Sequence, residues 1–306
     1  MMLYYNITSM LRSILVLVLA LLGTSPGWAA PKVIASIMPV HSIVSAVMGE
    51  TGAPELLLPG RLSEHTASLN PRQLSALGKA DLVFIVSARL EYKLGQISGS
   101  EAVNGKVFVE LAGVPGITTH AIRQGGAWDA DEDDHGPSDP HVWLDPENAK
   151  AMAAGAAAAL SKADPANAAA YAANAAKFTL SLDRLSEEIG ATLAPVKAKP
   201  FIVFHDAYQY FERRFGLNAA GSIADASGVS PSASRLESIR ARLRETGAAC
   251  VFREPQFDGK FAEVVIEGGA ARSGILDPLG AELPLGAEAY PQLLRNLAAN
   301  LRACLE

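Results

Sequence analysis

Cysteine and charge are both scarce in this sequence. Its 306 residues include 2 cysteines and no Cys-x-x-Cys pair, which excludes a disulfide-rich scaffold and a cysteine zinc knuckle. Charged residues make up 19% of the chain, and the net charge of −6 comes without a basic stripe, so we expect no nucleic-acid partner. Apolar residues make up 49%, too many for a disordered chain, and the length suits about two domains.

The first 29 residues have the layout of a secretory signal peptide. Arg12 is their only charge, an apolar run covers 14–22, and the small residues Gly27 and Ala29 precede the expected cleavage point. That run is too short to span a membrane, which takes about 20 residues. No cysteine near the cleavage point could carry a lipid. We therefore expect the protein to be exported.

Short apolar runs alternate with helical patterns over the rest of the chain, which predicts βαβ units and parallel sheets. The expected strands form two sets, at 33–37, 55–58, 82–86 and 107–111, and at 201–204, 219–223, 250–252 and 274–276. Helices are expected between them, among them 231–246 with Ser230 as N-cap and Pro231 in the first turn.

An alanine-rich region separates the two sets of strands and predicts one long helix. Asp164 is its expected N-cap, followed by Pro165. We therefore predict an α/β fold of two lobes, each a small, mostly parallel sheet with flanking helices, joined by one long rigid helix. The alternative is an ordinary helix within a single α/β sheet. The expected boundaries are a signal peptide at 1–29, an N-terminal lobe at 30–163, the linking helix at 164–198 and a C-terminal lobe at 199–306.

Three of the six histidines occupy matching positions on this map. His65 follows the second strand, His205 directly follows the strand at 201–204, and His141 precedes a helix capped by Asp145. Open α/β sheets bind ligands at the carboxyl ends of their strands. Spacing alone does not separate ligands from packed or solvated histidines, because no two of the three share one element. Of the others, His41 reads as structural and His120 as solvated.

Carboxylates that could complete a metal site also lie at strand ends, namely Glu64, Glu254 and Asp277. Three imidazoles with one oxygen make a tetrahedral set suited to Zn²⁺. Three histidines with an open position are also a catalytic arrangement, so a zinc-dependent hydrolase is an alternative. Only Glu64 or Glu254 would then be available as a general base.

The segment 129–135 carries five carboxylates and one imidazole. The simpler interpretation is a solvated acidic loop. The alternative is a collector of cations, because clustered carboxylates raise the local cation concentration.

The motifs around these histidines resemble the zinc-specific periplasmic substrate-binding proteins of ABC transporters. The most specific are Asp-Pro-His-Val-Trp-Leu-Asp-Pro and Phe-His-Asp-Ala-Tyr. The resemblance rests on the stretches 64–71, 139–146, 164–175, 203–208, 251–257 and 276–280.

The resemblance implies two lobes with Zn²⁺ bound between them by His65, His141 and His205. The fourth ligand stays open among Glu64 by motif, Asp277 by strand-end position, and water. It also implies a monomeric, non-enzymatic periplasmic protein that delivers zinc to a membrane permease. Imidazole suits zinc, whereas related manganese binders are expected to replace one histidine by a carboxylate. A Mn²⁺ or Fe²⁺ binder of the same fold is the alternative.

Two features depart from that family. Thr66 and Ala67 follow His65 where the family usually has an aromatic residue, and the loop before 139–146 is short and acidic rather than long and rich in histidine. The cysteines agree with the zinc branch, which also carries a pair near the C-terminus. Export would let Cys250 and Cys304 form a lasting disulfide, with two buried free thiols as the alternative.

Overall fold

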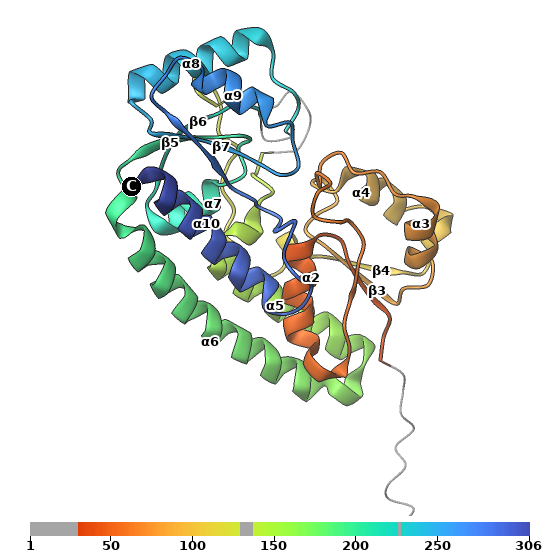
Figure 1. Ribbon diagram of the computed structural model, residues 1–306. Helices are drawn as coiled ribbons and strands as arrows, with labels where there is room; N and C mark the ends of the chain where they lie inside the picture. The colour runs from red at the N-terminus through yellow and green to blue at the C-terminus, as the bar shows by residue number, and fades with distance from the viewer. Residues whose placement is uncertain (1–29, 129–136, 226–227) are drawn as a thin grey trace, which may run out of the picture. The chain divides into compact units, whose positions relative to one another are not determined.

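The computed structural model describes residues 30–128, 137–225 and 228–306 (Figure 1). The expected signal peptide and the acidic segment at 129–135 lie outside the described residues. Residues 31–306 belong to one compact unit. Within the described ranges no helix combines the length and the apolar character needed to cross a membrane.

Two parallel sheets organise the described part of this unit. The first has the order β2-β1-β3-β4, from β1 (Val33–Ala35), β2 (Glu55–Leu56), β3 (Leu82–Ile85) and β4 (Val107–Glu110). The second has the order β6-β5-β7-β8, from β5 (Pro200–Val203), β6 (Asn218–Ser222), β7 (Cys250–Arg253) and β8 (Arg272–Ile275). Every strand pairing is parallel. The predicted α/β fold is confirmed.

In both sheets the order in which the chain adds strands reverses at the central pair of strands. The chain passes from β5 to β6 on one side and then to β7 on the other, and β1, β2 and β3 repeat the pattern. Such a reversal leaves a crevice at the carboxyl ends of the central strands, which is where open α/β sheets bind ligands. In the second sheet His205 and Glu254 lie at this crevice, one after β5 and one after β7.

The helices flank the sheets and link them. They are α2 (Met38–Met48), α3 (Pro71–Leu77), α4 (Tyr92–Ser98), α5 (Pro146–Ala163), α6 (Ala168–Leu193), α7 (Gln209–Phe215), α8 (Ala233–Thr246), α9 (Lys260–Ile266) and α10 (Ala289–Leu305). Helix α3 begins with a capping box, in which Asn70 accepts from the Gln73 amide and the Gln73 side chain accepts from the Asn70 amide.

The predicted N-cap of α8 is wrong by two residues. Ser232, and not Ser230, accepts a hydrogen bond from the Arg235 amide at 3.2 Å, so Pro231 precedes the helix. Both serines satisfy the sequence preference for a cap, and only the backbone geometry decides between them.

The long helix also begins later than predicted. Pro165–Asn167 form a 3-10 turn, and α6 starts at Ala168. Asp164 is the N-cap residue of that turn and Pro165 takes its first position, as predicted. The Asp164 carboxylate accepts hydrogen bonds from Asn167 Nδ2 at 2.7 Å and from the Tyr171 hydroxyl at 2.8 Å.

Helix α6 packs against α2, α5 and α10, and it extends past both α2 and α10 in Figure 1. The buried face of α6, with Tyr171, Phe178 and Leu182 among its residues, belongs to a core that also includes residues of both sheets. A second, smaller core lies between the second sheet and helices α8 and α9. One continuous core therefore joins the first sheet, the linking helices and one face of the second sheet.

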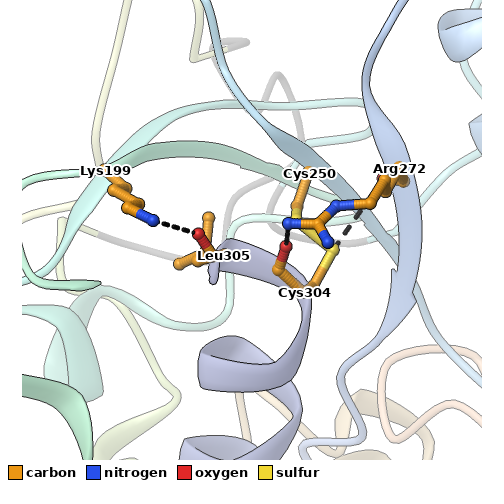
Figure 2. Close-up of a disulfide and its surroundings, with 5 residues drawn as sticks. All are labelled: Lys199, Cys250, Arg272, Cys304 and Leu305. Atoms are coloured by element: carbon orange, nitrogen blue, oxygen red, sulfur yellow. Dashed lines mark hydrogen bonds between the residues drawn. A yellow bond between two sulfur atoms is a disulfide. The ribbon is translucent and has the colours of Figure 1, made fainter. Parts of the chain in front are cut away.

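A disulfide ties the end of α10 to the second sheet. Cys304 of α10 is bonded to Cys250 of β7, as predicted (Figure 2). Arg272 Nη2 donates to the Cys304 carbonyl oxygen, and Lys199 Nζ donates to the Leu305 carbonyl oxygen at 2.6 Å. Cations at the last carbonyls complement the helix dipole, so this end of α10 is held by one covalent and two charged contacts.

Candidate metal site

Four of the five predicted metal ligands meet in one buried cluster. One side-chain donor atom from each of Glu64, His65, His141 and His205 lies within 4.8 Å of the other three. All four residues are at most 8% exposed. Their loops come from different parts of the chain, so the fold, and not local sequence, creates the cluster.

The spacing of the donor atoms fits a small ion. His141 Nε2 lies 3.3 Å from His65 Nε2 and 3.4 Å from His205 Nε2. Nitrogen ligands about 2.0–2.1 Å from a tetrahedral zinc are separated by about 3.3 Å. Glu64 Oε1 lies 3.8 Å from His65 Nε2 and 3.9 Å from His141 Nε2, which puts a carboxylate at the fourth corner.

The loop that carries His141 is firmly held. His141 precedes a 3-10 turn, Val142–Leu144, that leads into α5, whose N-cap Asp145 accepts from the Glu147 amide. Within this turn the buried Trp143 indole donates to the Pro278 carbonyl of the second lobe at 2.9 Å. His141 is thereby fixed against both lobes.

Carboxylates contact the outer nitrogens of two of the three imidazoles. Asp139 Oδ1 lies 2.8 Å from His141 Nδ1 and accepts from the His141 amide at 2.9 Å. Both oxygens of Glu254 lie 2.8 Å from His205 Nδ1. An Nδ1–H group that donates to a carboxylate leaves the Nε2 lone pair free to face a metal.

Burial dominates the electrostatics of the site. It raises the pKa of Glu64 to about 7 and that of Asp139 to about 7, because a carboxylate loses its hydration there. Burial alone would lower the pKa of His205, but Glu254, Glu64 and Asp206 raise it to about 9. Several buried carboxylates thus favour a cation in this place.

Glu64 has a carboxylate oxygen that is available to bind a metal ion. Its Oε1 atom is buried and, among the described residues, has no hydrogen-bond donor. An unsatisfied buried carboxylate oxygen is costly, and a metal ion would satisfy it. With Glu64 the four protein ligands would close the coordination shell, which is typical of binding sites rather than of catalytic zinc sites.

Asp277, the other candidate for the fourth ligand, does not join the cluster. Its carboxylate accepts backbone hydrogen bonds from Leu279 at 3.1 Å, Gly280 at 2.9 Å and Ala281 at 2.6 Å. It also accepts from Gln256 Nε2 at 3.0 Å. These contacts give Asp277 the role of organising a turn after β8.

The remaining described histidines lie elsewhere. His41 is buried in α2 with Nε2 3.0 Å from the Pro54 carbonyl oxygen, in agreement with a structural role. The ring of His120 lies 4.8 Å from that of Tyr210, and the residue is half-buried, so it is partly solvated. His135 lies outside the described residues.

Sequence reasoning missed the outer support of His141. Gln209 Nε2 donates to Asp139 Oδ2 at 3.3 Å and to the Ala121 carbonyl at 3.0 Å. The spacing Asp139-Pro140-His141 could have indicated the contact, since a carboxylate two residues before a histidine can reach its ring. The position of Gln209 depends on the packing of α7 and has no comparable signal.

Comparisons with known proteins agree with this geometry. Residues 33–304 match the family model described as zinc-uptake complex component A, periplasmic. The high-affinity zinc uptake system protein ZnuA of Brucella abortus is 42% identical, with 92% of this chain and 94% of that protein aligned. The protein of the same name from Paracoccus denitrificans is 36% identical, over 97% of this chain and 99% of that protein.

A solved structure is similar over nearly the same span. The crystal structure of a ZnuA superimposes with a TM-score of 0.76 at 29% identity, covering 90% of this chain and 100% of the other.

Proposed function

Because the chain belongs to the family of periplasmic zinc-uptake components, we propose that it captures Zn²⁺ in the cleft between its lobes and delivers it to the permease of an ABC transporter. The single observation that carries the proposal is the buried cluster of three imidazole nitrogens and one carboxylate oxygen at tetrahedral spacing. Glu64 and His65 come from the N-terminal lobe and His205 from the C-terminal lobe, so zinc is bound where the lobes meet.

His65, His141, His205 and Glu64 are the proposed ligands, with zinc as cargo rather than as a resident cofactor. Three imidazoles suit zinc better than manganese, for which carboxylate-rich sites are typical. The metal binds between an N-terminal lobe at 30–163 and a C-terminal lobe at 199–306, joined by the helix at 164–198. Glu64 as fourth ligand leaves no open position for a substrate or water, which argues for binding rather than hydrolysis.

The protein acts as a monomer in the periplasm, after export directed by the signal peptide at 1–29. The arrangement of that segment and the family's periplasmic description support this location. The permease would take zinc from the loaded protein at the membrane.

Metal analysis and uptake together test this function. Protein isolated from the periplasm of cells grown with equal zinc and manganese should contain one zinc per chain. Cells lacking the gene should take up less radioactive zinc, and a copy carrying His205→Ala should not restore uptake. Protein isolated with manganese, or full restoration by His205→Ala, would overturn the proposal.

A further inference from the structure

We propose that Asp139 and Glu254 are positioning residues of the zinc site, which fix the rings of His141 and His205 and thereby set zinc affinity. This inference rests on the proposed function, since it assigns a role to groups behind the ligands. Neither carboxylate belongs to the ligand cluster. Both act through a histidine that does.

Glu254 contacts both the ring and the backbone amide of His205. Both of its oxygens lie 2.8 Å from His205 Nδ1, and Oε1 also accepts from the His205 amide at 3.3 Å. The residue is 2% exposed and lies directly after β7, the strand beside β5. The crevice between the central strands therefore supplies the ligand from one strand and its orienting carboxylate from the next.

Asp139 repeats this arrangement on His141. Its Oδ1 atom accepts from the amide and faces Nδ1 of the same histidine, while Oδ2 accepts from Gln209 Nε2. The carboxylate cannot rotate without breaking one of these bonds. Asp139 thus fixes the ring of His141, and the His141 amide and Gln209 in turn fix the Asp139 carboxylate.

One short segment connects the two arrangements. His205 is a proposed ligand, and Gln209, four residues later, donates to Asp139 Oδ2 at 3.3 Å. Residues 205–209 therefore carry one ligand and the donor that holds the orienting carboxylate of another.

The chemical consequence is a fixed tautomer. A carboxylate at Nδ1 keeps the proton there, directs the Nε2 lone pair into the cluster and makes the imidazole a stronger donor. Loss of such outer partners typically costs 10–100-fold in metal affinity. Without these carboxylates each ring could turn or exchange its proton. Part of the free energy of zinc binding would then be lost in ordering the ring.

The test measures zinc affinity by competition with a chelator and follows the Nδ1–H signals of zinc-loaded protein by proton–nitrogen NMR. Glu254→Ala and Asp139→Ala should each lower affinity about 10–100-fold. Each should also remove the protected Nδ1–H signal of its own histidine alone. Glu254→Gln and Asp139→Asn keep an acceptor oxygen, so they should retain the signal and lose less affinity than the alanine variants.

Glu91→Gln is the matched control. Glu91 is buried in the first lobe and accepts from the amides of Val86 at 3.2 Å and Ser87 at 2.9 Å, so its replacement perturbs packing without touching a histidine ring. It should leave zinc affinity and both Nδ1–H signals unchanged. A loss of affinity equal to that of Glu254→Gln would show that any buried carboxylate matters equally and would overturn the inference.

The two proposals fail in different ways. If the wild-type protein binds zinc weakly, or His205→Ala binds it as well as the wild type, the proposed function fails. If His205→Ala loses zinc while the alanine and amide variants of Asp139 and Glu254 bind like wild type with their signals intact, only the positioning role fails.

Discussion

Zinc coordination in this protein depends on which nitrogen each imidazole turns toward the others. Three Nε2 atoms converge, with His141 Nε2 at 3.3 Å from His65 Nε2 and at 3.4 Å from His205 Nε2. The sequence could indicate the three histidines from their places at strand ends and from the surrounding motifs. It could not rank Glu64 against Asp277, because both follow strands and only the folded backbone shows which carboxylate is already hydrogen-bonded.

Glu64 and Asp277 should therefore respond differently to neutralisation. Glu64→Gln should weaken zinc binding, since it removes the charged ligand. Asp277→Asn should leave zinc affinity unchanged but lower the free energy of unfolding by about 1–3 kcal/mol, because three backbone amides lose a charged acceptor. Chelator competition and thermal unfolding of both variants measure the two effects. The opposite pattern, with affinity lost only in Asp277→Asn, would make Asp277 the fourth ligand.

Zinc affinity should fall as the pH falls, and the fall should begin above neutral pH. In the metal-free protein the pKa of His205 is raised to about 9 and that of Glu64 to about 7. Below its pKa each group holds a proton that zinc must displace, so each lowers the apparent log K by about one per pH unit. Titrations from pH 9 to pH 6 against a chelator of known pH dependence measure the slope. A flat profile in this range would be incompatible with these ligands.

At the scale of elements, the sequence predicted strands better than helix ends. Short apolar runs indicated the strands, and each of the eight predicted runs overlaps a strand. The start of α8 depended on which of two serines caps it, and α6 starts only after the 3-10 turn Pro165–Asn167, for which Asp164 is the N-cap residue. Side-chain hydrogen bonds formed only in the fold decide such ends, so local sequence leaves them open.

The position of helix α10 also depends on contacts that the local sequence does not reveal, here with residues far away in the chain. Its amphipathic pattern predicts a helix, but its position between the lobes comes from contacts across the chain. The Tyr290 amide donates to Ser42 Oγ of α2 at 2.8 Å, and the Tyr290 hydroxyl donates to the Trp143 carbonyl at 2.6 Å. The last helix therefore supports the His141 turn as well as the second sheet.

Removal of the disulfide should destabilise the protein without removing zinc. Cys250 and Cys304 are 54 residues apart, for which the chain-entropy model gives about 4 kcal/mol. The free energy of unfolding of the double variant Cys250→Ser/Cys304→Ser should be lower by about this amount, and the variant should still bind one zinc. Chemical unfolding with and without reductant provides the measurement, and the double variant should be insensitive to reductant. An unchanged unfolding midpoint would show that the two charged contacts at the end of α10 suffice.

For the whole molecule, zinc should act as a clamp between the lobes. The ligands His65 and His141 belong to the N-terminal side and His205 to the second sheet, so only the folded arrangement binds the ion tightly. A ligand present at 100 times its Kd stabilises the folded state by about 2.7 kcal/mol. Zinc should therefore raise the Tm of the wild type in calorimetry. His205→Ala should show little of this shift, and an equal shift in that variant would place the stabilising zinc elsewhere.

The overall architecture was predictable because alternating buried strands and amphipathic helices leave few ways to build a sheet. The relative placement of the two lobes was not, because it depends on the shared core of α2, α5, α6 and α10. The site lies at this junction. Its histidines could thus be named from sequence, while their distances required the structure.

Competition titration of zinc into the wild type and into His65→Ala, His141→Ala and His205→Ala provides the most direct test of the three-histidine site. We expect one zinc per wild-type chain. Each substitution should lower zinc affinity by more than the roughly 100-fold upper range for outer partners, since a ligand itself is lost. His120→Ala, outside the cluster, should bind like the wild type. Wild-type affinity in any of the three ligand variants would contradict the three-histidine site.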